Sequence, residues 1–197
     1  MKKIVLFSAL LLVIIIACKS GNNTPKNSVT INLEPKSGSK VEGTATFTER
    51  NGVVYLEAKI SGLTPGVHAI HIHEKSDCSA ADATSAGGHW NPTFKKHGKW
   101  GAEEYHKGDI GNFAADENGN GKIVFSTDEW CIGCGDPAKD VLGKGLIVHQ
   151  SADDFATQPT GNSGARVACY SIIKKQTINS YLKQFCIILR NGFLNLI

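Results

Sequence analysis

Apolar and polar residues alternate along most of the chain between residues 28 and 173, in short runs separated by turns rich in Gly and Asn. Successive side chains of a β-strand point to opposite faces, so this two-residue period predicts strands with one buried face. Residues 28–34 place Val29, Ile31 and Leu33 on one side. The pair Asn51-Gly52 between two such runs is a strong hairpin signal. The pattern predicts eight strands, at 28–34, 41–49, 52–61, 67–73, 110–116, 121–127, 144–150 and 165–173.

Eight short strands without a convincing long amphipathic helix before residue 176 indicate an all-β fold. The expected architecture is an eight-stranded antiparallel β-barrel or sandwich. Three connections, at 74–109, 128–143 and 151–163, are long for such a fold. Long loops without a pattern of their own are either functional or a sign that an element has been missed.

The first residues have the features of an export signal. Lys2 and Lys3 precede an apolar run that ends at Ala17, directly before Cys18. The run is shorter than the ~20 apolar residues of a transmembrane helix, so it predicts a signal peptide over 1–17. Its end resembles a bacterial lipobox, which predicts a lipidated Cys18 followed by a tether over 18–27. The alternative is ordinary cleavage beside a stray Cys.

If this prediction holds, the protein is an exported, membrane-anchored lipoprotein that faces the periplasm or the cell surface. Removal of Lys2 and Lys3 leaves 21 − 2 = 19 basic and 18 acidic residues, so the formal charge falls from +3 to about +1. Without a basic stripe, nucleic acid is not expected as a partner. The composition, 41% hydrophobic and 20% charged, suits one packed domain, expected over 28–173.

The six Cys residues are informative because disulfides persist in an oxidising compartment. Lipidation of Cys18 would leave five, an odd number. Cys131 and Cys134 form a C-x-x-C pair, which is either a local disulfide that stiffens the loop or a reactive redox or metal pair. The odd thiol is expected to be Cys186, in a C-terminal extension over 174–197. That extension is consistent with an interfacial helix, a dimer contact or a disordered segment.

The seven His residues are placed in a way that suggests metal chemistry. His71 and His73 lie two apart on a predicted strand and therefore share a face, whereas His68 faces the opposite way. Imidazole binds zinc, copper, iron and nickel, and a carboxylate can complete a zinc shell. Taken singly, each of these His residues could be an ordinary surface or structural residue. The remaining candidate donors are His89, His97, His106 and Asp109 in the long loop and His149 at a strand end.

Several motifs, in order, resemble the copper–zinc superoxide dismutases. The resemblance runs from about residue 28 to residue 173 and is made by segments that each carry candidate donors or turn glycines. They are GVHAIHIHE at 66–74, SAGGHWNP at 85–92, KHG at 96–98, HKGDIGN at 106–112, LIVH at 146–149, ADD at 152–154 and GNSGARVAC at 161–169.

The resemblance implies a Greek-key β-barrel of eight strands with long metal-binding and electrostatic loops. It implies that His89 bridges two metal ions as an imidazolate. Copper would be held by His71, His73, His89 and His149, and zinc by His89, His97, His106 and Asp109.

Further roles are implied by the same resemblance. Asp153 would tie ligands of both metals together, and His68 would be a buried hydrogen-bonding residue. Cys78 and Cys169 would form a disulfide that anchors the metal loop. Arg166 would lie near copper and attract superoxide. Lys144 could add to this attraction, but a solvated strand end is the simpler interpretation of that residue.

The implied activity is the dismutation of superoxide to dioxygen and hydrogen peroxide, and a homodimer is a further expected association. Two other classes compete with the enzyme. One is a non-catalytic copper–zinc binding or delivery protein, and the other is a structural relative that retains only zinc. The full set of copper donors and Arg166 favour the enzyme.

Overall fold

The computed structural model describes residues 27–174. The predicted signal peptide, Cys18 with most of the tether, and Cys186 in the extension lie outside the described residues. Among the described residues, no helix has the length and apolar character needed to cross a membrane. The eight strands are β1 (Ser28–Pro35), β2 (Glu42–Arg50), β3 (Val53–Ser61), β4 (Gly66–His73), β5 (Gly111–Ala115), β6 (Gly121–Thr127), β7 (Lys144–His149) and β8 (Arg166–Ile172).

All eight predicted strands are confirmed, and each boundary moves by at most one residue. The alternation explains this agreement, because β1 and β3 are buried at every second position. The sequence pattern did not predict the 3-10 turn η1 (Thr84–Ala86), which interrupts the long loop after β4.

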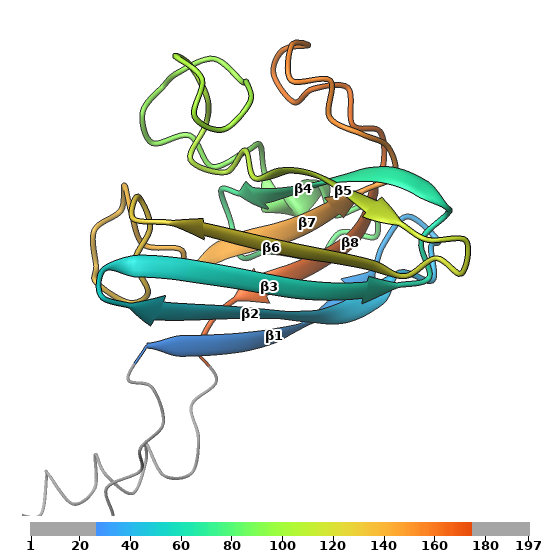
Figure 1. Ribbon diagram of the computed structural model, residues 1–197, viewed down its shortest axis with the longest axis horizontal. Coiled ribbons are helices and arrows are strands. Elements are labelled where there is room, and N and C mark those ends of the chain that lie inside the picture. Colours follow the sequence, from blue (N-terminus) through green and yellow to red (C-terminus); the bar gives the residue numbers. More distant parts are fainter. Residues whose placement is uncertain (1–26, 175–197) are drawn as a thin grey trace, which may run out of the picture. The chain divides into compact units, whose positions relative to one another are not determined.

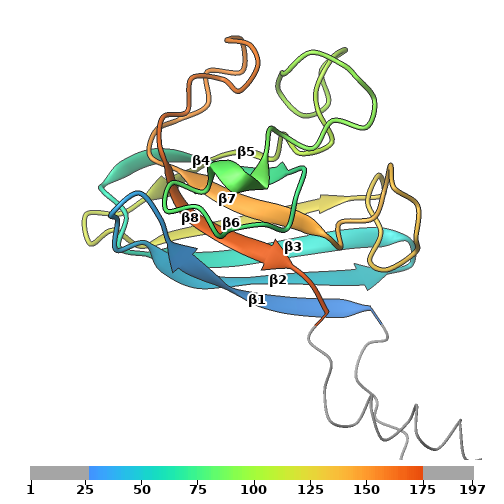
Figure 2. The same ribbon diagram turned by 180° about the vertical axis from the view of Figure 1, so that it is seen from behind.

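The strands close into an antiparallel barrel in the order β1-β2-β3-β6-β5-β4-β7-β8 (Figures 1 and 2). β3 pairs with β6 and not with β4, so the chain crosses over before β4. A second crossover brings β7 beside β4. This arrangement is the expected Greek-key topology, and it leaves β4 between β5 and β7.

The interior of the barrel is filled by the inward-facing residues of the strands. Phe47, Val54 and Leu56 are fully buried there, and Trp130 closes the core from the loop after β6. Such a core removes a large apolar area from water, which is the main stabilising contribution to the barrel.

β4 and β7 differ from the other strands because both of their faces are buried. Ile70 and Ile72 of β4 point into the core, whereas His71 and His73 occupy the outer face. His149 at the end of β7 lies on the same outer side. The loop after β4 and the segment before β8 both rise from this side of the barrel (Figures 1 and 2). The fold therefore builds a second, polar interior outside the barrel.

Candidate metal centre

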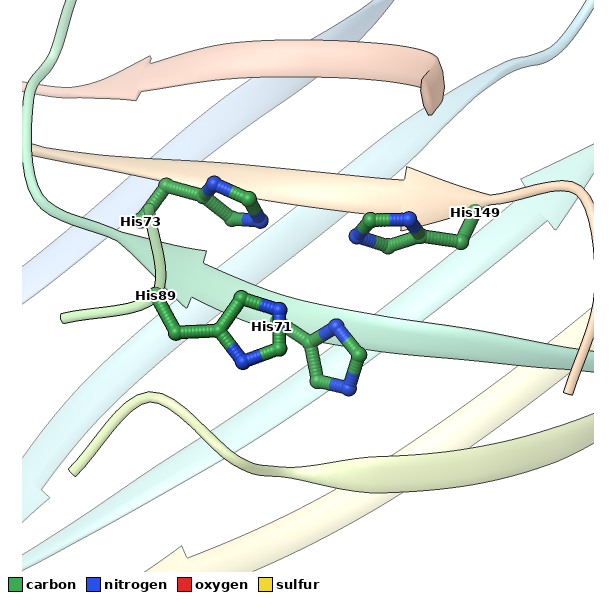
Figure 3. A group of neighbouring side chains, drawn as sticks. All are labelled: His71, His73, His89 and His149. Carbon is green, nitrogen blue, oxygen red and sulfur yellow. The ribbon is translucent and has the colours of Figure 1, made fainter. Parts of the chain in front are cut away.

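The first donor group gathers four imidazoles on the outer face of β4 and β7. Its members are His71, His73, His89 and His149, all buried, with one donor atom of each lying within 4.8 Å of the others. Figure 3 shows His71 and His73 on β4, His149 at the end of β7, and His89 on the long loop. His89 is brought there by an isolated β-bridge to His73.

Backbone contacts hold the long loop against the last residues of β4. The amide of Trp90 donates to the carbonyl of Ile72 at 2.8 Å, and the amide of Ile72 donates to the carbonyl of Gly108 at 2.9 Å. A Cβ atom at Gly108 would lie 2.1 Å from the Ile72 carbonyl oxygen. Only glycine fits this approach, which carries both His89 and Asp109 to the centre.

The second donor group, His89, His97, His106 and Asp109, surrounds the Asp109 carboxylate. Nδ1 of His89 lies 2.8 Å from Oδ1 of Asp109. Nδ1 of His97 lies 3.0 Å from Oδ2, and Nδ1 of His106 lies 3.3 Å from Oδ1. The contacts of His97 and His106 are close but are not aligned as hydrogen bonds. Donors that share one Zn²⁺ with bonds of about 2 Å stand at most about 4 Å apart, so this arrangement fits a common cation.

A test of fit to metal comes from the buried nitrogen atoms. Within residues 27–174, six imidazole nitrogens are buried without a hydrogen-bond partner, which is normally costly. The other nitrogen of each ring is hydrogen-bonded, so each imidazole is oriented and presents a free lone pair. The six are Nδ1 of His71, His97 and His106 and Nε2 of His73, His89 and His149. Imidazole nitrogens with one carboxylate suit copper and zinc.

Asp153 connects the two donor groups. Its Oδ2 accepts a hydrogen bond from Nε2 of His71 at 2.9 Å, and its Oδ1 accepts one from Nε2 of His97 at 2.9 Å. Gly161 makes room for this carboxylate, because a Cβ there would lie 1.8 Å from Oδ1 of Asp153. One buried carboxylate thus fixes a ring from each group, as carboxylates beside metal-binding imidazoles do.

Burial and the two carboxylates set the protonation of the site. Burial lowers the pKa of His73 and of His149 well below the usual value. Burial also lowers the pKa of His89, to about 4, against the opposing effect of its hydrogen bond to Asp109. His97 differs: burial disfavours its charge, but its close contact with the Asp109 carboxylate and its hydrogen bond to Asp153 raise its pKa to about 9. Despite desolvation, the hydrogen bond from His89 and the close contacts of His97 and His106 lower the pKa of Asp109.

Neutral imidazoles and ionised carboxylates are the states that bind metal ions. His73, His89 and His149 are therefore neutral and able to bind a metal ion at neutral pH. Without a metal ion His97 would be protonated, and a bound cation can replace that proton.

Arg166 begins β8 beside the first donor group, since it pairs in register with His149. Its Nη1 donates to the carbonyl of Ala83 at 2.8 Å, which fixes the side chain. Burial lowers the pKa of Arg166, yet an Arg side chain remains charged at any physiological pH. The positive charge of Arg166 acts on the first donor group, because it contributes to the lowered pKa values of His73 and His149.

The remaining candidates are placed as follows. His68 shares the inner face of β4, where its Nδ1 lies 2.9 Å from the carbonyl oxygen of His149 and its Nε2 lies 2.8 Å from that of Thr64. Cys78 forms a disulfide with Cys169, and Cys131 forms one with Cys134. Lys144 lies over the ring of Trp90, 5.3 Å from its centroid, at the other end of β7 from His149.

Three residues that the sequence did not predict as part of the site position its donor side chains. The Asn112 amide group exchanges two hydrogen bonds of 2.8 Å with the backbone of Asp153. Gln158 binds both backbone groups of His97, and the Ser163 hydroxyl lies 3.2 Å from Nδ1 of His149. Asn112 lies within a motif that was recognised, but nothing local marked its partner 41 positions away.

Comparisons with known proteins agree on one family. The family described as Copper/zinc superoxide dismutase (SODC) matches residues 41–172. A protein of Caulobacter vibrioides named Superoxide dismutase [Cu-Zn] is 40% identical over 134 residues, which is 66% of this chain and 77% of the relative. Superoxide dismutase [Cu-Zn] 2 of Aquifex aeolicus is 36% identical over 135 residues, 66% of this chain and 78% of the relative.

A solved structure gives the same result at the level of the fold. The crystal structure of the clock protein EA4 superposes with a TM-score of 0.64 and is 34% identical. The match covers 78% of this chain and 98% of that protein.

Proposed function

The chain belongs to the copper/zinc superoxide dismutase family, and from that premise we propose how its residues divide the work. It is an oxidoreductase that dismutes superoxide and takes copper and zinc as cofactors. The proposal concerns the residues that hold each metal, the shared ligand, the role of Arg166 and the location of the protein.

We propose that His89 belongs to both metal sites. Its Nδ1 faces Asp109 in the second donor group, and its Nε2 is one of the orphaned buried nitrogens. The six orphaned nitrogens are the observation that carries the proposal. Copper is then held by His71, His73, His89 and His149, and zinc by His89, His97, His106 and Asp109.

When bound, copper supplies the one-electron couple that dismutation requires, and zinc supplies positive charge without redox chemistry. Nε2 of His89 is the atom suited to accept and return a proton, since its ring stays oriented by contacts at Nδ1. Asp153 keeps His71 and His97 in the tautomers that leave their Nδ1 atoms free. Each half of the site thus keeps its geometry while the proton moves.

Substitutions at the two groups test the shared ligand. In the wild type we expect one copper and one zinc per chain by elemental analysis. His73→Ala should lose copper and keep zinc, and His106→Ala should lose zinc and keep copper. His89→Ala should weaken both, because it removes a ligand from each site. Loss of a single metal in His89→Ala would overturn the bridge.

We propose that Arg166 attracts the superoxide anion toward the first donor group. The formal charge of the mature chain is near zero, so attraction must come from local charge. Arg166→Ala should lower kcat/KM severalfold or more at low ionic strength with both metals retained, and Arg166→Lys should keep part of the rate. An unchanged rate for Arg166→Ala would reject this role.

We also propose that the enzyme is exported and held at a membrane by lipid on Cys18. The charge and apolar pattern of residues 1–17 support this. Mass spectrometry of the native protein should find a lipid adduct on Cys18, and an unmodified N-terminus elsewhere would end the idea.

A homodimer is part of the proposal. It is supported by the exposed side chains of Tyr55 on β3 and Val124 on the adjacent β6. Analytical ultracentrifugation measures the mass of the protein in solution and therefore tests this association.

A further inference from the structure

The loop that joins β6 to β7, over residues 128–143, contains a disulfide that the metal centre does not use. Cys131 and Cys134 are three positions apart, with Cα atoms 6.0 Å from each other. We propose that this pair is a reversible thiol–disulfide exchange site. Its reductant is a low-molecular-mass thiol, and its oxidant is the corresponding disulfide.

The two cysteine residues differ in exposure to solvent. Cys131 is 8% exposed and lies between Trp130 and Ile132, which are 1% and 2% exposed and belong to the barrel core. Cys134 is exposed, in a turn between Gly133 and Gly135. An incoming thiolate must reach the sulfur that it attacks, so Cys134 is the accessible target and Cys131 the leaving group.

The loop does not depend on the disulfide for its shape. The backbone of Cys131 donates to Lys139 at 2.8 Å and accepts from Val141 at 3.1 Å. The Asp140 carboxylate accepts hydrogen bonds of 2.9–3.0 Å from the amides of Gly133, Gly135 and Leu142. These contacts persist after reduction and keep the two thiols within reach of each other, so the bond can form again.

Charge over the turn favours the thiolate form that exchange requires. A Cβ atom on Gly133, between the two cysteines, would lie 3.0 Å from Nζ of Lys174. A nearby ammonium group stabilises a thiolate. The Asp140 carboxylate opposes this, but its charge is shared among three backbone donors.

The exchange is balanced as two steps. A thiolate RS⁻ attacks Sγ of Cys134, the Cys131–Cys134 bond breaks, and Cys131 leaves as a thiolate that takes a proton from water. A second RS⁻ attacks the mixed disulfide, which forms RSSR and releases Cys134 as a thiolate that also takes a proton from water. The protein gains two electrons and two protons, and RSSR reverses the sequence.

The other disulfide of the chain is the internal control. Cys169 is fully buried in β8, and it packs with Ala83, Ala86 and Ile147. Its bond to Cys78 closes a span of 91 positions. Cys78 is partly buried, whereas Cys134 is exposed, so a thiolate has a narrower path to this bond than to Cys131–Cys134. Disulfides that are exposed are the labile ones, and buried structural ones resist reduction.

The full oxidised chain, with both metals bound, is incubated with reduced glutathione, and free thiols are alkylated and assigned by peptide mass spectrometry. Cys131–Cys134 should open at least about tenfold faster than Cys78–Cys169, and oxidised glutathione should close it again. Circular dichroism and dismutase activity should not change. Equal rates for the two disulfides, or opening only in step with unfolding, would overturn the proposal.

Two single variants test the direction of attack. Both variants are incubated with oxidised glutathione, whose disulfide the free protein thiolate attacks with release of one reduced glutathione. Cys131→Ser should accumulate a glutathione adduct on Cys134, because no neighbouring thiol can displace it. Cys134→Ser should form the adduct on Cys131 at least about tenfold more slowly, because that sulfur is covered. Preferential modification of Cys131 would contradict the assignment. Neither residue touches the metal centre, so these outcomes are independent of the proposed function.

Discussion

The loops around the metal centre and the loop between β6 and β7 are both long and irregular, but they are ordered by different interactions. The metal loops, residues 74–110 and 150–165, cover the outer face of β4 and β7, and the first of them carries three imidazoles with unpaired nitrogens, those of His89, His97 and His106. The β6–β7 loop, residues 128–143, buries Trp130, Ile132 and Val141 in the barrel core. The first region therefore needs a cation to satisfy its buried polar atoms, whereas the second is complete without one.

The two regions also meet. The Tyr105 hydroxyl donates to Glu129 at 2.5 Å, and Lys107 forms an ion pair with the same carboxylate. The indole nitrogen of Trp130 donates to the carbonyl of Lys107 at 2.9 Å. A change in the metal loops can thus be compared with the response of the adjacent β6–β7 loop, which is ordered by its own contacts with the barrel core.

The largest expected difference follows metal removal. Chelation should raise amide hydrogen exchange across residues 89–109 by about 100-fold or more and lower the melting temperature by more than about 10 °C, because the orphaned nitrogens lose their partner. Exchange within 128–143 should stay within about threefold of the loaded protein. Equal loss of protection in both regions would show that the β6–β7 loop depends on metal as well.

The second-largest difference is expected between the two disulfides, in the stability that each contributes to the folded protein. In the chain-entropy model, loss of Cys78–Cys169 costs about 4–5 kcal/mol, and loss of Cys131–Cys134 costs at most about 2 kcal/mol. Chemical denaturation of Cys78→Ala/Cys169→Ala and of Cys131→Ala/Cys134→Ala measures this. The spans of 91 and 3 positions are the physical reason for the difference. A larger loss for the short-span pair would mean that the loop needs its disulfide.

The substitution Asp140→Ala should destabilise mainly the β6–β7 loop. Three amides lose their acceptor, and only that of Leu142 is partly buried while those of Gly133 and Gly135 are exposed, which predicts a loss of about 1–2 kcal/mol in the free energy of unfolding. Asp136→Ala is a matched control, because within residues 27–174 its carboxylate accepts a hydrogen bond only from the amide of Ala138. Metal content should not change in either variant, and a loss of zinc would contradict the independence of the two regions.

The smallest effect concerns the contact between the regions. The hydrogen bond to Glu129, with burial and the Glu129 charge adding to it, raises the pKa of Tyr105 to about 12 from the usual 10.0. The neutral phenol is the form favoured in the folded protein, so its contribution is complete below about pH 10 and is lost as the pH rises through about 12. The phenolate absorbance of wild type minus Tyr105→Phe measures this ionisation. A midpoint near 10 would show that the bond is absent.

Much of the fold was predictable, because strand formation follows a local rule. In β1 and β3, every second residue is apolar and buried, and the turn at Asn51-Gly52 joins β2 to β3 as expected. His71 and His73 were assigned to one face from their spacing alone, and both lie on the outer face of β4. The members of the two donor groups were predicted from the family resemblance, and the structure brings the members of each group together.

The positioning residues could not be found in the same way. Asn112 lies 41 positions from Asp153, and Gln158 lies 61 positions from His97. The sequence also left open whether Cys131 and Cys134 form a bond, and the tertiary structure pairs them and surrounds them with the contacts of Asp140.

The sequence by itself determined the strands, the shared face of two imidazoles and the small charge of the chain, because these depend on residues a few positions apart. Only the tertiary structure decided that Asp153 links His71 to His97, that Gly108 lies against the carbonyl of Ile72, and that Cys134 is exposed while Cys169 is not. Such contacts arise when the barrel closes and brings distant segments together, and no local pattern encodes that closure.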